Sequence, residues 1–411
     1  MTQPLVAEAS SEPIDLLTAD VLDEPYPAYH ELRSRAPVQW NPIFGGAWLV
    51  TRYEDVVPAL RNRSLSSRRG VASLVGLPDH VRAKFSQFEA FYTTSMLTQD
   101  HPKHTRIRAL VTRAFTPRSL EELRPLVRRV VEDLLEPFRE ARQMDLIYDF
   151  AYPLPAIVIA EMMGLPWEDR DRLKVWGDDL AMFVGGGMNP LDLAEAGQQS
   201  MLDMADYFRE WIARRHEEPG EDLISKLIQE YDGDRLTDDE VWSQCLLLLT
   251  AGHQTTRDLI GNGIWALLHN PDQYRLYLDD PSLRDSAVEE FLRYDSPVQM
   301  AGRMVTERIQ IGGQWIEPGK RVIMILGAAN RDPERFPDPD RLLVDRQDNK
   351  HVAFGAGPHH CIGAFLARLE GQEAFDVLLR TCPNIQAEIN EVERQRNATF
   401  RRIKYLPIHW D

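Results

Sequence analysis

Cysteine is scarce in this chain of 411 residues, which carries only Cys245, Cys361 and Cys382. Three widely spaced cysteines cannot build a disulfide framework, so they indicate a reducing compartment. The sequence also lacks a signal-like apolar run at its start, and no stretch approaches the roughly 18 apolar residues of a membrane span. These absences predict a cytoplasmic protein without a membrane anchor.

Positive charge is also in deficit, because 47 Lys and Arg face 64 Asp and Glu for a net charge of -17. That balance argues against general affinity for nucleic acid or an anionic membrane. Gly/Ser-rich linkers, low-complexity tracts and repeats are missing too, although the apolar fraction of 43% suffices for a large core. We therefore expect a flexible tail over residues 1–15, a single domain over residues 16–411, and a monomer.

The most informative stretch is Phe-Gly-Ala-Gly-Pro-His-His-Cys-Ile-Gly, residues 354–363, which an apolar helical run follows. Its glycines and proline predict a tight loop that ends on Cys361 at the start of a helix. A thiol placed there meets unpaired backbone N–H groups and the positive end of the helix dipole, which favour the thiolate. A buried thiolate indicates either an electrophilic substrate or a metal.

Two simpler interpretations of this stretch stay open on the residues alone. His351, His359, His360 and Cys361 could suggest zinc, but adjacent residues converge poorly on one tetrahedral ion and no second ligand pair stands at finger spacing. Cys361 could also be an ordinary buried cysteine.

The order Phe-x-x-Gly-x-x-x-Cys-x-Gly resembles the cysteine-ligand loop of the cytochrome P450 family. The resemblance implies a mainly α fold with a small β region, a large helical domain around a buried haem b, and Cys361 as the axial ligand. Phe354, Gly355 and Gly363 would belong to the same cofactor loop. Thiolate ligation favours cleavage of dioxygen, so the implied activity is insertion of one oxygen atom from O2 into an organic substrate.

A long helical pattern covers residues 237–269, opening with the capping box Thr-Asp-Asp-Glu. Its apolar middle is followed by Ala-Gly-His-Gln-Thr, which resembles the family's Ala-Gly-x-acid-Thr above the oxygen-binding face of the haem. The resemblance implies that Ala251 and Gly252 make room for dioxygen and that the Thr255 hydroxyl assists proton delivery. The alternative is a threonine bonded back to the carbonyl four residues earlier.

Gln254 departs from the pattern, because the family usually has an acid there. An amide cannot release a proton at neutral pH, so water, His253 or the substrate would have to deliver it. We expect Gln254→Glu to raise the product formed per NADPH. The departure also keeps a peroxide-driven enzyme open as an alternative.

Other segments follow the family's order. His104 and Arg108 share one helical face and, with Arg303 and His359, would bind the haem propionates, although an ordinary solvated helix is the alternative for the first pair. Glu-x-x-Arg would place two residues in a buried ion network that Arg341 completes, and five more residues would line the substrate pocket. These are Glu290, Arg293 and Arg341 for the network and Leu247, Val298, Gln299, Met300 and Phe400 for the pocket.

Local patterns also predict the remaining elements. We expect helices over residues 25–35 and 119–163, a hairpin over 38–51, and strands over 400–410. A small β region is expected over 309–326, with residues 309–316 turning back on themselves at Gly312-Gly313. Residues 68–98 are expected to be irregular and to form much of the pocket. Helices over 176–216 would flank the triple glycine 185–187, which would serve as a hinged lid.

The chain contains no flavin- or iron–sulfur-binding segment, which implies a separate ferredoxin or flavodoxin with its NAD(P)H-dependent reductase. Arg106, Lys350 and Arg368 are candidates for docking that acidic partner, with solvated surface charge as the alternative. We expect a small hydrophobic substrate, first a polyketide, macrolide, terpenoid or fatty-acid-derived natural product. Catabolic oxidation of a small aromatic or terpene and a non-catalytic haem sensor are the alternatives.

Overall fold

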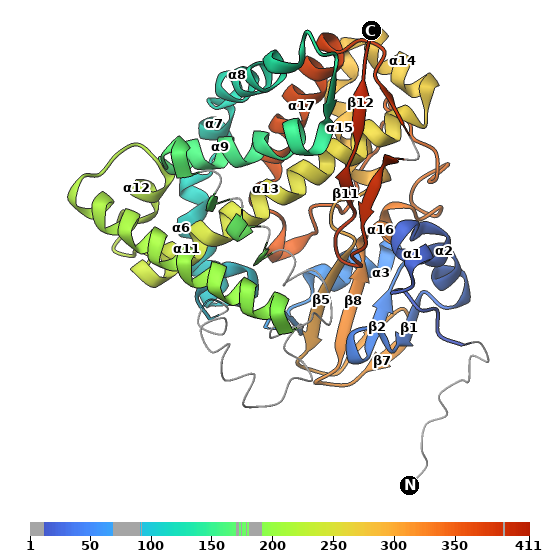
Figure 1. Ribbon diagram of the computed structural model, residues 1–411. Helices are drawn as coiled ribbons and strands as arrows, with labels where there is room; N and C mark the ends of the chain where they lie inside the picture. Colours follow the sequence, from blue (N-terminus) through green and yellow to red (C-terminus); the bar gives the residue numbers. More distant parts are fainter. Residues whose placement is uncertain are drawn as a thin grey trace.

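The computed structural model describes residues 12–68, 91, 93–169, 172–173, 175–177, 179–180, 191–388 and 391–411. Most of the long helices gather on one side of the molecule, and the largest sheet lies on the other with a few short helices beside it (Figure 1). The mainly α fold with a small β region is therefore confirmed. Of the predicted irregular segment 68–98, only residues 68, 91 and 93–98 are described, and the triple-glycine lid lies wholly outside the described residues.

The β region contains two hairpins that the sequence predicts. α1 (Ala19–Asp23) and α2 (Tyr26–Arg35) lead into β1 (Val38–Asn41) and β2 (Ala47–Val50), which pair antiparallel. The second hairpin, β6 (Ile309–Ile311) and β7 (Gln314–Ile316), turns at Gly312 and Gly313, whose φ angles of 54° and 82° suit glycine. Both predictions are confirmed.

One five-stranded sheet joins distant parts of the chain in the order β1-β2-β8-β5-β3. β2 runs parallel to β8 (Arg321–Ile325), and β5 (Met300–Val305) runs antiparallel to both β8 and β3 (Leu65–Ser66). α3 (Tyr53–Arg61) and α16 (Leu326–Asn330) pack beside it.

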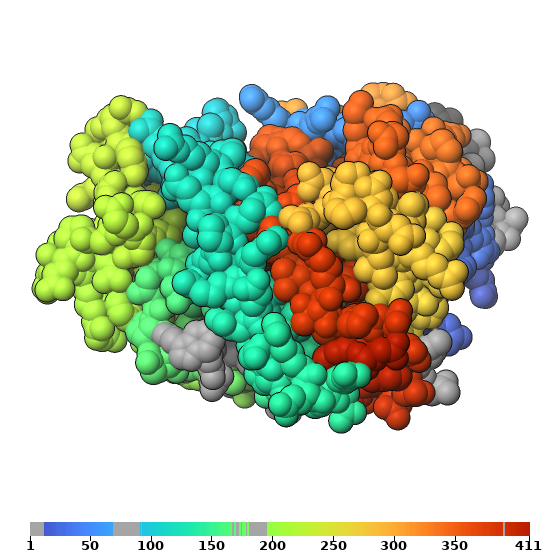
Figure 2. Space-filling view, turned by 90° about the horizontal axis from the view of Figure 1, so that it is seen from above, coloured from blue at the N-terminus to red at the C-terminus, as the bar shows by residue number. Residues whose placement is uncertain are grey.

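The helical side consists of elements whose apolar faces meet in one core. Its helices are α6 (Lys103–Ala114), α7 (Pro117–Glu121), α8 (Arg124–Leu135), α9 (Pro153–Met163), α11 (Leu191–Glu217), α12 (Leu223–Leu227), α13 (Asp238–Leu268), α14 (Pro271–Asp279), α15 (Arg284–Tyr294) and α17 (Ala364–Thr381). Figure 2 shows the teal, yellow and red segments, far apart in sequence, side by side on one face.

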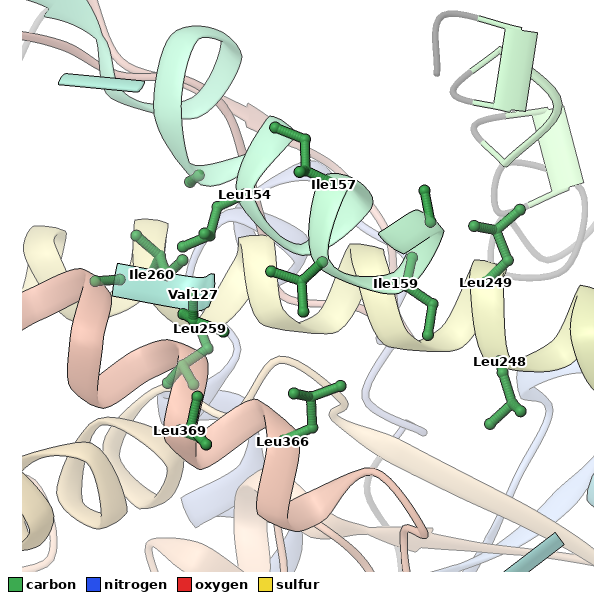
Figure 3. Packing of buried hydrophobic residues seen from close by; sticks show 14 of the residues in the cluster. Val127, Leu154, Ile157, Ile159, Leu248, Leu249, Leu259, Ile260, Leu366 and Leu369 are labelled. Carbon is green, nitrogen blue, oxygen red and sulfur yellow. The ribbon is translucent and has the colours of Figure 1, made fainter. Parts of the chain in front are cut away.

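α13 is the central helix, and the predicted capping box starts it. Thr237 Oγ1 accepts from the N–H of Glu240 at 3.2 Å, and the Glu240 carboxylate accepts from the N–H of Thr237 at 3.1 Å. Buried side chains of α13 pack between those of α9 and α17 (Figure 3). This long buried helix is confirmed, with bounds one residue inside the predicted ones at each end.

The prediction of continuous helix over residues 119–163 is wrong in its middle. β4 (Gln143–Asp145) interrupts it and pairs with β12 (Pro407–His409), which also pairs with β9 (Gln386–Ala387). The partner strand lies far away in sequence, so a local pattern could not reveal it. β10 (Glu393–Gln395) and β11 (Arg402–Tyr405) form a further pair, so the strands expected near the end are confirmed.

One described stretch, Leu146–Met163, is apolar and long enough to cross a membrane by length and composition, with a mean hydropathy of 1.4. The expectation that no stretch comes near that length is corrected accordingly. Because 67% of the stretch is buried inside the protein, it is accounted for as core. Leu154 and Ile159 point toward the central helix in Figure 3.

Candidate functional site

The loop before Cys361 folds as its glycines require. Gly355 and Gly357 have φ angles of 69° and 72°, in the left-handed region. A Cβ at Gly357 would lie 3.0 Å from the carbonyl oxygen of Leu60, so a larger residue would clash with backbone. The N–H of Cys361 donates to the Phe354 carbonyl at 2.9 Å, and α17 begins at Ala364. The predicted tight loop that delivers Cys361 to a helix start is confirmed.

The pKa of Cys361 is shifted in the direction opposite to the one the sequence predicts. Cys361 is accessible to solvent, but burial of its sulfur among protein atoms raises the pKa of the thiol above its ordinary value. A hydrogen bond from the N–H of Gly363 and the charges of Arg108 and Arg368 lower that pKa only in part. The groups around the sulfur therefore favour the thiolate less than burial disfavours it, whereas a bound metal would deprotonate the sulfur outright.

Four basic side chains predicted as propionate ligands gather beside this loop. The ring centroids of His104 and His359 are 4.1 Å apart, and Arg108 donates to the carbonyl of His360 at 2.7 Å. His359 Nε2 lies 2.9 Å from the hydroxyl of Ser67.

The surroundings of the His104 imidazole indicate which kind of ligand these basic side chains bind. Burial lowers the pKa of His104, and the nearby charges of Arg108 and Arg303 lower it further. Its Nε2 is buried and has no hydrogen-bond partner among the described residues. A buried imidazole nitrogen without a partner among the described residues, close to the guanidinium groups of Arg108 and Arg303, indicates a site for an anionic ligand.

The Glu-x-x-Arg network is buried as predicted, with one correction. Arg293 Nε and Nη2 donate to the Glu290 carboxylate at 2.7 and 2.8 Å. The third member is Arg346, whose Nε donates to Glu290 at 3.0 Å, and not Arg341. The side chain of Arg341 is exposed, and only its backbone carbonyl accepts a hydrogen bond from Arg293. Two arginines follow the prolines here, and the path of the loop decides which one turns inward.

The middle of α13 leaves free space at Ala251 and Gly252, where the sequence predicts room for a small ligand. Ala251 is exposed, and a Cβ added to Gly252 would meet nothing within 4 Å. Thr255 Oγ1 donates to the Ala251 carbonyl at 2.8 Å, which is the back-bonded arrangement weighed as the alternative. The hydroxyl is only partly buried, so it can change partner by rotation.

Gln254 is held by both ends of its amide. Its Nε2 donates to the carbonyl of Gly177 at 2.9 Å, and its Oε1 accepts from Arg402 Nη2 at 2.7 Å. Arg402 also donates to Asp258 at 3.2 Å. Gln254 thus joins α13 to a distant strand and to Gly177. Sequence reasoning missed these partners because they lie far along the chain.

This network changes the expected result of Gln254→Glu. A carboxylate facing Arg402 would stay ionised and would therefore be a poor proton donor, and it could not donate to Gly177. We expect product formed per NADPH to stay near the wild-type value and thermal stability to fall. The measurement is NADPH consumption against product, beside a melting curve. A clear rise in coupling would restore the original hypothesis.

Two predicted pocket residues point elsewhere. Gln299 is buried and its Nε2 donates to the Ser296 carbonyl at 2.7 Å, while Met300 packs in the cluster beneath α2. Their assignment to the substrate face is not supported, because these contacts hold both side chains inside the protein. Val298 forms a β-bridge with Phe400, and Leu247 lies in the main core.

Zinc is not supported by the geometry, since no group of three or more His, Cys, Asp or Glu side chains in the described part of the chain could hold a metal ion.

Comparison with known proteins identifies the family. The family model for cytochrome P450 matches residues 281–401. Cytochrome P450 CYP107DY1 of Priestia megaterium is 40% identical over 371 residues, 89% of this chain and 90% of that protein. The chain belongs to the cytochrome P450 family.

Two further similarities bear on function. Cytochrome P450 monooxygenase PikC of Streptomyces venezuelae is 38% identical over 415 residues, covering 98% of this P450 chain and 95% of the relative. The crystal structure of P450BioI in complex with an acyl carrier protein ligated to hexadec-9Z-enoic acid superposes with a TM-score of 0.90 at 36% identity, covering 96% of this chain and 100% of that one. The fold and family predicted from the sequence are confirmed.

The P450 family implies a haem held by a cysteine thiolate, and the residues present fit it. Cys361 stands at the end of its glycine loop, and the unpartnered Nε2 of His104 lies among cations suited to carboxylates. Gly252 leaves space on α13 for a small ligand. A thiolate-ligated haem, when bound, supplies the activation of dioxygen.

Proposed function

We propose that this protein is a monooxygenase that inserts one oxygen atom from O2 into an organic substrate, with Cys361 as axial ligand of haem b. The observation that carries the proposal is the buried His104 Nε2, unpartnered among the described residues, beside Arg108 and Arg303. Arg108 also donates to His360, next to Cys361, so the anion site and the thiol share one loop. Residues 16–411 would form one monomeric, cytoplasmic domain around that cofactor.

The test is turnover under labelled dioxygen with NAD(P)H, a ferredoxin or flavodoxin, and its reductase. We expect each product molecule to gain one labelled oxygen atom. Peroxide alone giving the same rate would defeat the dioxygen mechanism, and spectral binding of ligands without product would favour a haem sensor.

The proposed electron donor is a separate acidic protein. Two of the three basic residues considered for docking are engaged inside the molecule, since Arg106 pairs with Glu240 and Asp234 and Arg368 pairs with Glu289. Lys350 is 78% exposed and pairs only loosely with Asp348 at 3.4 Å. Among these three, Lys350 is the best placed for an external partner.

The proposed substrate is a hydrophobic natural product of the polyketide, macrolide, terpenoid or fatty-acid-derived classes. A solved relative that binds a fatty acyl chain on a carrier protein supports the fatty-acid-derived class in particular. The absorption shift on titration with free fatty acids and with acyl-loaded carrier protein distinguishes a free substrate from a bound one.

Thr255→Ala tests proton delivery. In the structure the Thr255 hydroxyl donates to the Ala251 carbonyl. Rotation of the side chain would turn this hydroxyl toward the free space beside Gly252. Without the hydroxyl we expect hydrogen peroxide per NADPH to rise severalfold and product to fall. Thr255→Ser, which keeps the hydroxyl, is the matched control and should stay near wild type. Equal peroxide release from both variants would contradict this role.

A further inference from the structure

Two consecutive carboxylates on α15 hold different parts of the segment that leads to Cys361. Glu290 binds Arg293 and Arg346. Glu289 points elsewhere, because successive side chains on a helix project about 100° apart. It binds His351, ahead of the cysteine loop, at 3.1 Å, and Arg368, on α17 beyond it, at 2.9 Å. One carboxylate therefore ties together both flanks of the loop.

The proton on His351 is placed by its other contact. The N–H of Ala353 donates to His351 Nδ1 at 3.2 Å, so this nitrogen is an acceptor. The proton then sits on Nε2, which donates to Glu289. The side chain of His351 is 2% exposed, so the bond is shielded from water. Burial raises the pKa of Glu289, but hydrogen bonds from His351 and Arg368 outweigh it and bring the value to about 2.

Arg368 carries the connection to the loop itself. Its guanidinium lies over the ring of Phe354 at 4.5 Å from the centroid. The carbonyl of Phe354 accepts the hydrogen bond from the N–H of Cys361 at 2.9 Å. The Arg368 charge also acts on the sulfur of Cys361.

We propose that Glu289 is a positioning residue that fixes the Cys361 loop through His351 and Arg368 and neutralises the Arg368 charge that the sulfur feels. This inference rests on the proposed ligation of haem by Cys361. Nothing in the cytochrome P450 signature requires Glu289, since the Glu-x-x-Arg pattern is complete with Glu290. Its action is electrostatic as well as mechanical, because an unopposed cation beside the thiolate stabilises the reduced, more negative cofactor.

The experiment is the reduction potential of the haem, measured by spectroelectrochemistry on the wild type, Glu289→Gln, Arg368→Gln and the double variant. Glu289→Gln leaves Arg368 unopposed and should shift the potential to more positive values. Arg368→Gln leaves Glu289 unopposed and should shift it to more negative values. The double variant should return close to wild type. Opposite single shifts that cancel are a pattern that mere loosening of the fold cannot give.

Asp348→Asn is the matched control, because it removes the same charge from a side chain that is 64% exposed and pairs with Arg335 and Lys350 on the surface. Solvent screens that position, so the potential should stay at the wild-type value. Single-variant shifts of the same sign, or none beyond the Asp348→Asn shift, would overturn the inference. If Glu289→Gln fails to fold, the negative shift of Arg368→Gln decides alone. Absence of a thiolate-type carbon monoxide spectrum in the wild type would instead defeat the proposed function.

Discussion

Replacing Cys361 with serine is expected to abolish the strongly red-shifted Soret band of the reduced carbon monoxide complex and to lower NAD(P)H-driven product formation by roughly three orders of magnitude, about 4 kcal/mol of barrier. The reason is chemical. A serine hydroxyl stays neutral beside the metal and cannot donate electron density as a thiolate does. The loop should still form, because its glycines and the bond from residue 361 to the Phe354 carbonyl involve only backbone.

Cys382→Ser makes the same chemical change at a cysteine buried in the main core. Its carbon monoxide spectrum should match the wild type even if its melting temperature falls. A histidine-type spectrum in the wild type, or a red-shifted band retained by Cys361→Ser, would contradict the assignment of the ligand. The chain would then use its cysteine loop differently from its relatives.

Glu370→Gln is expected to stabilise the protein by about 3 kcal/mol at pH 7 and about 5 kcal/mol above pH 8. Glu370 lies on α17 and is 2% exposed. Burial raises its pKa to about 8, and a hydrogen bond from Thr256 offsets this only in part. Ionising a carboxyl group in the core is costly, and a neutral amide of the same shape avoids that cost.

The raised pKa of Glu370 determines how the free energy of unfolding changes with pH. The stability that protonated Glu370 provides is complete below about pH 4, where the unfolded chain is also protonated, and is lost as the pH rises toward 8. Urea unfolding of the wild type and Glu370→Gln at pH 5, 7 and 9 measures it. The two free energies of unfolding should converge at low pH and separate as the pH rises. A gap that is independent of pH would contradict the assignment.

Glu373 provides the matched contrast one turn further along the same helix. It is just as buried, but Arg124 and Arg128 donate to its carboxylate at 2.7 Å. Glu373→Gln should therefore destabilise the protein at neutral pH, because it leaves guanidinium groups without their counter-charge. The same substitution at neighbouring buried positions is thus expected to have opposite effects.

Features that depend on nearby residues were predictable from the sequence. The glycine loop before Cys361, the capping box at Thr237 and both hairpins follow from local patterns. The interior of the site follows from contacts between distant segments. Arg346 in place of Arg341 and the partners of Gln254 depend on where loops pass in three dimensions. Likewise, no local periodicity could show that Gln299 turns inward or that β4 pairs near the far end of the chain.

The sheet topology also has a consequence for biosynthesis. β2 pairs with β8, and β4 pairs with β12. The ribosome therefore synthesises β2 and β4 long before it synthesises the strands with which they pair. At roughly 5–20 residues per second, that interval is tens of seconds on the ribosome. During it the early strands present open edges that invite aggregation. The cysteine loop lies between β8 and β12 in sequence, so a nascent chain should need chaperone protection until it can close its sheets and take up its cofactor together.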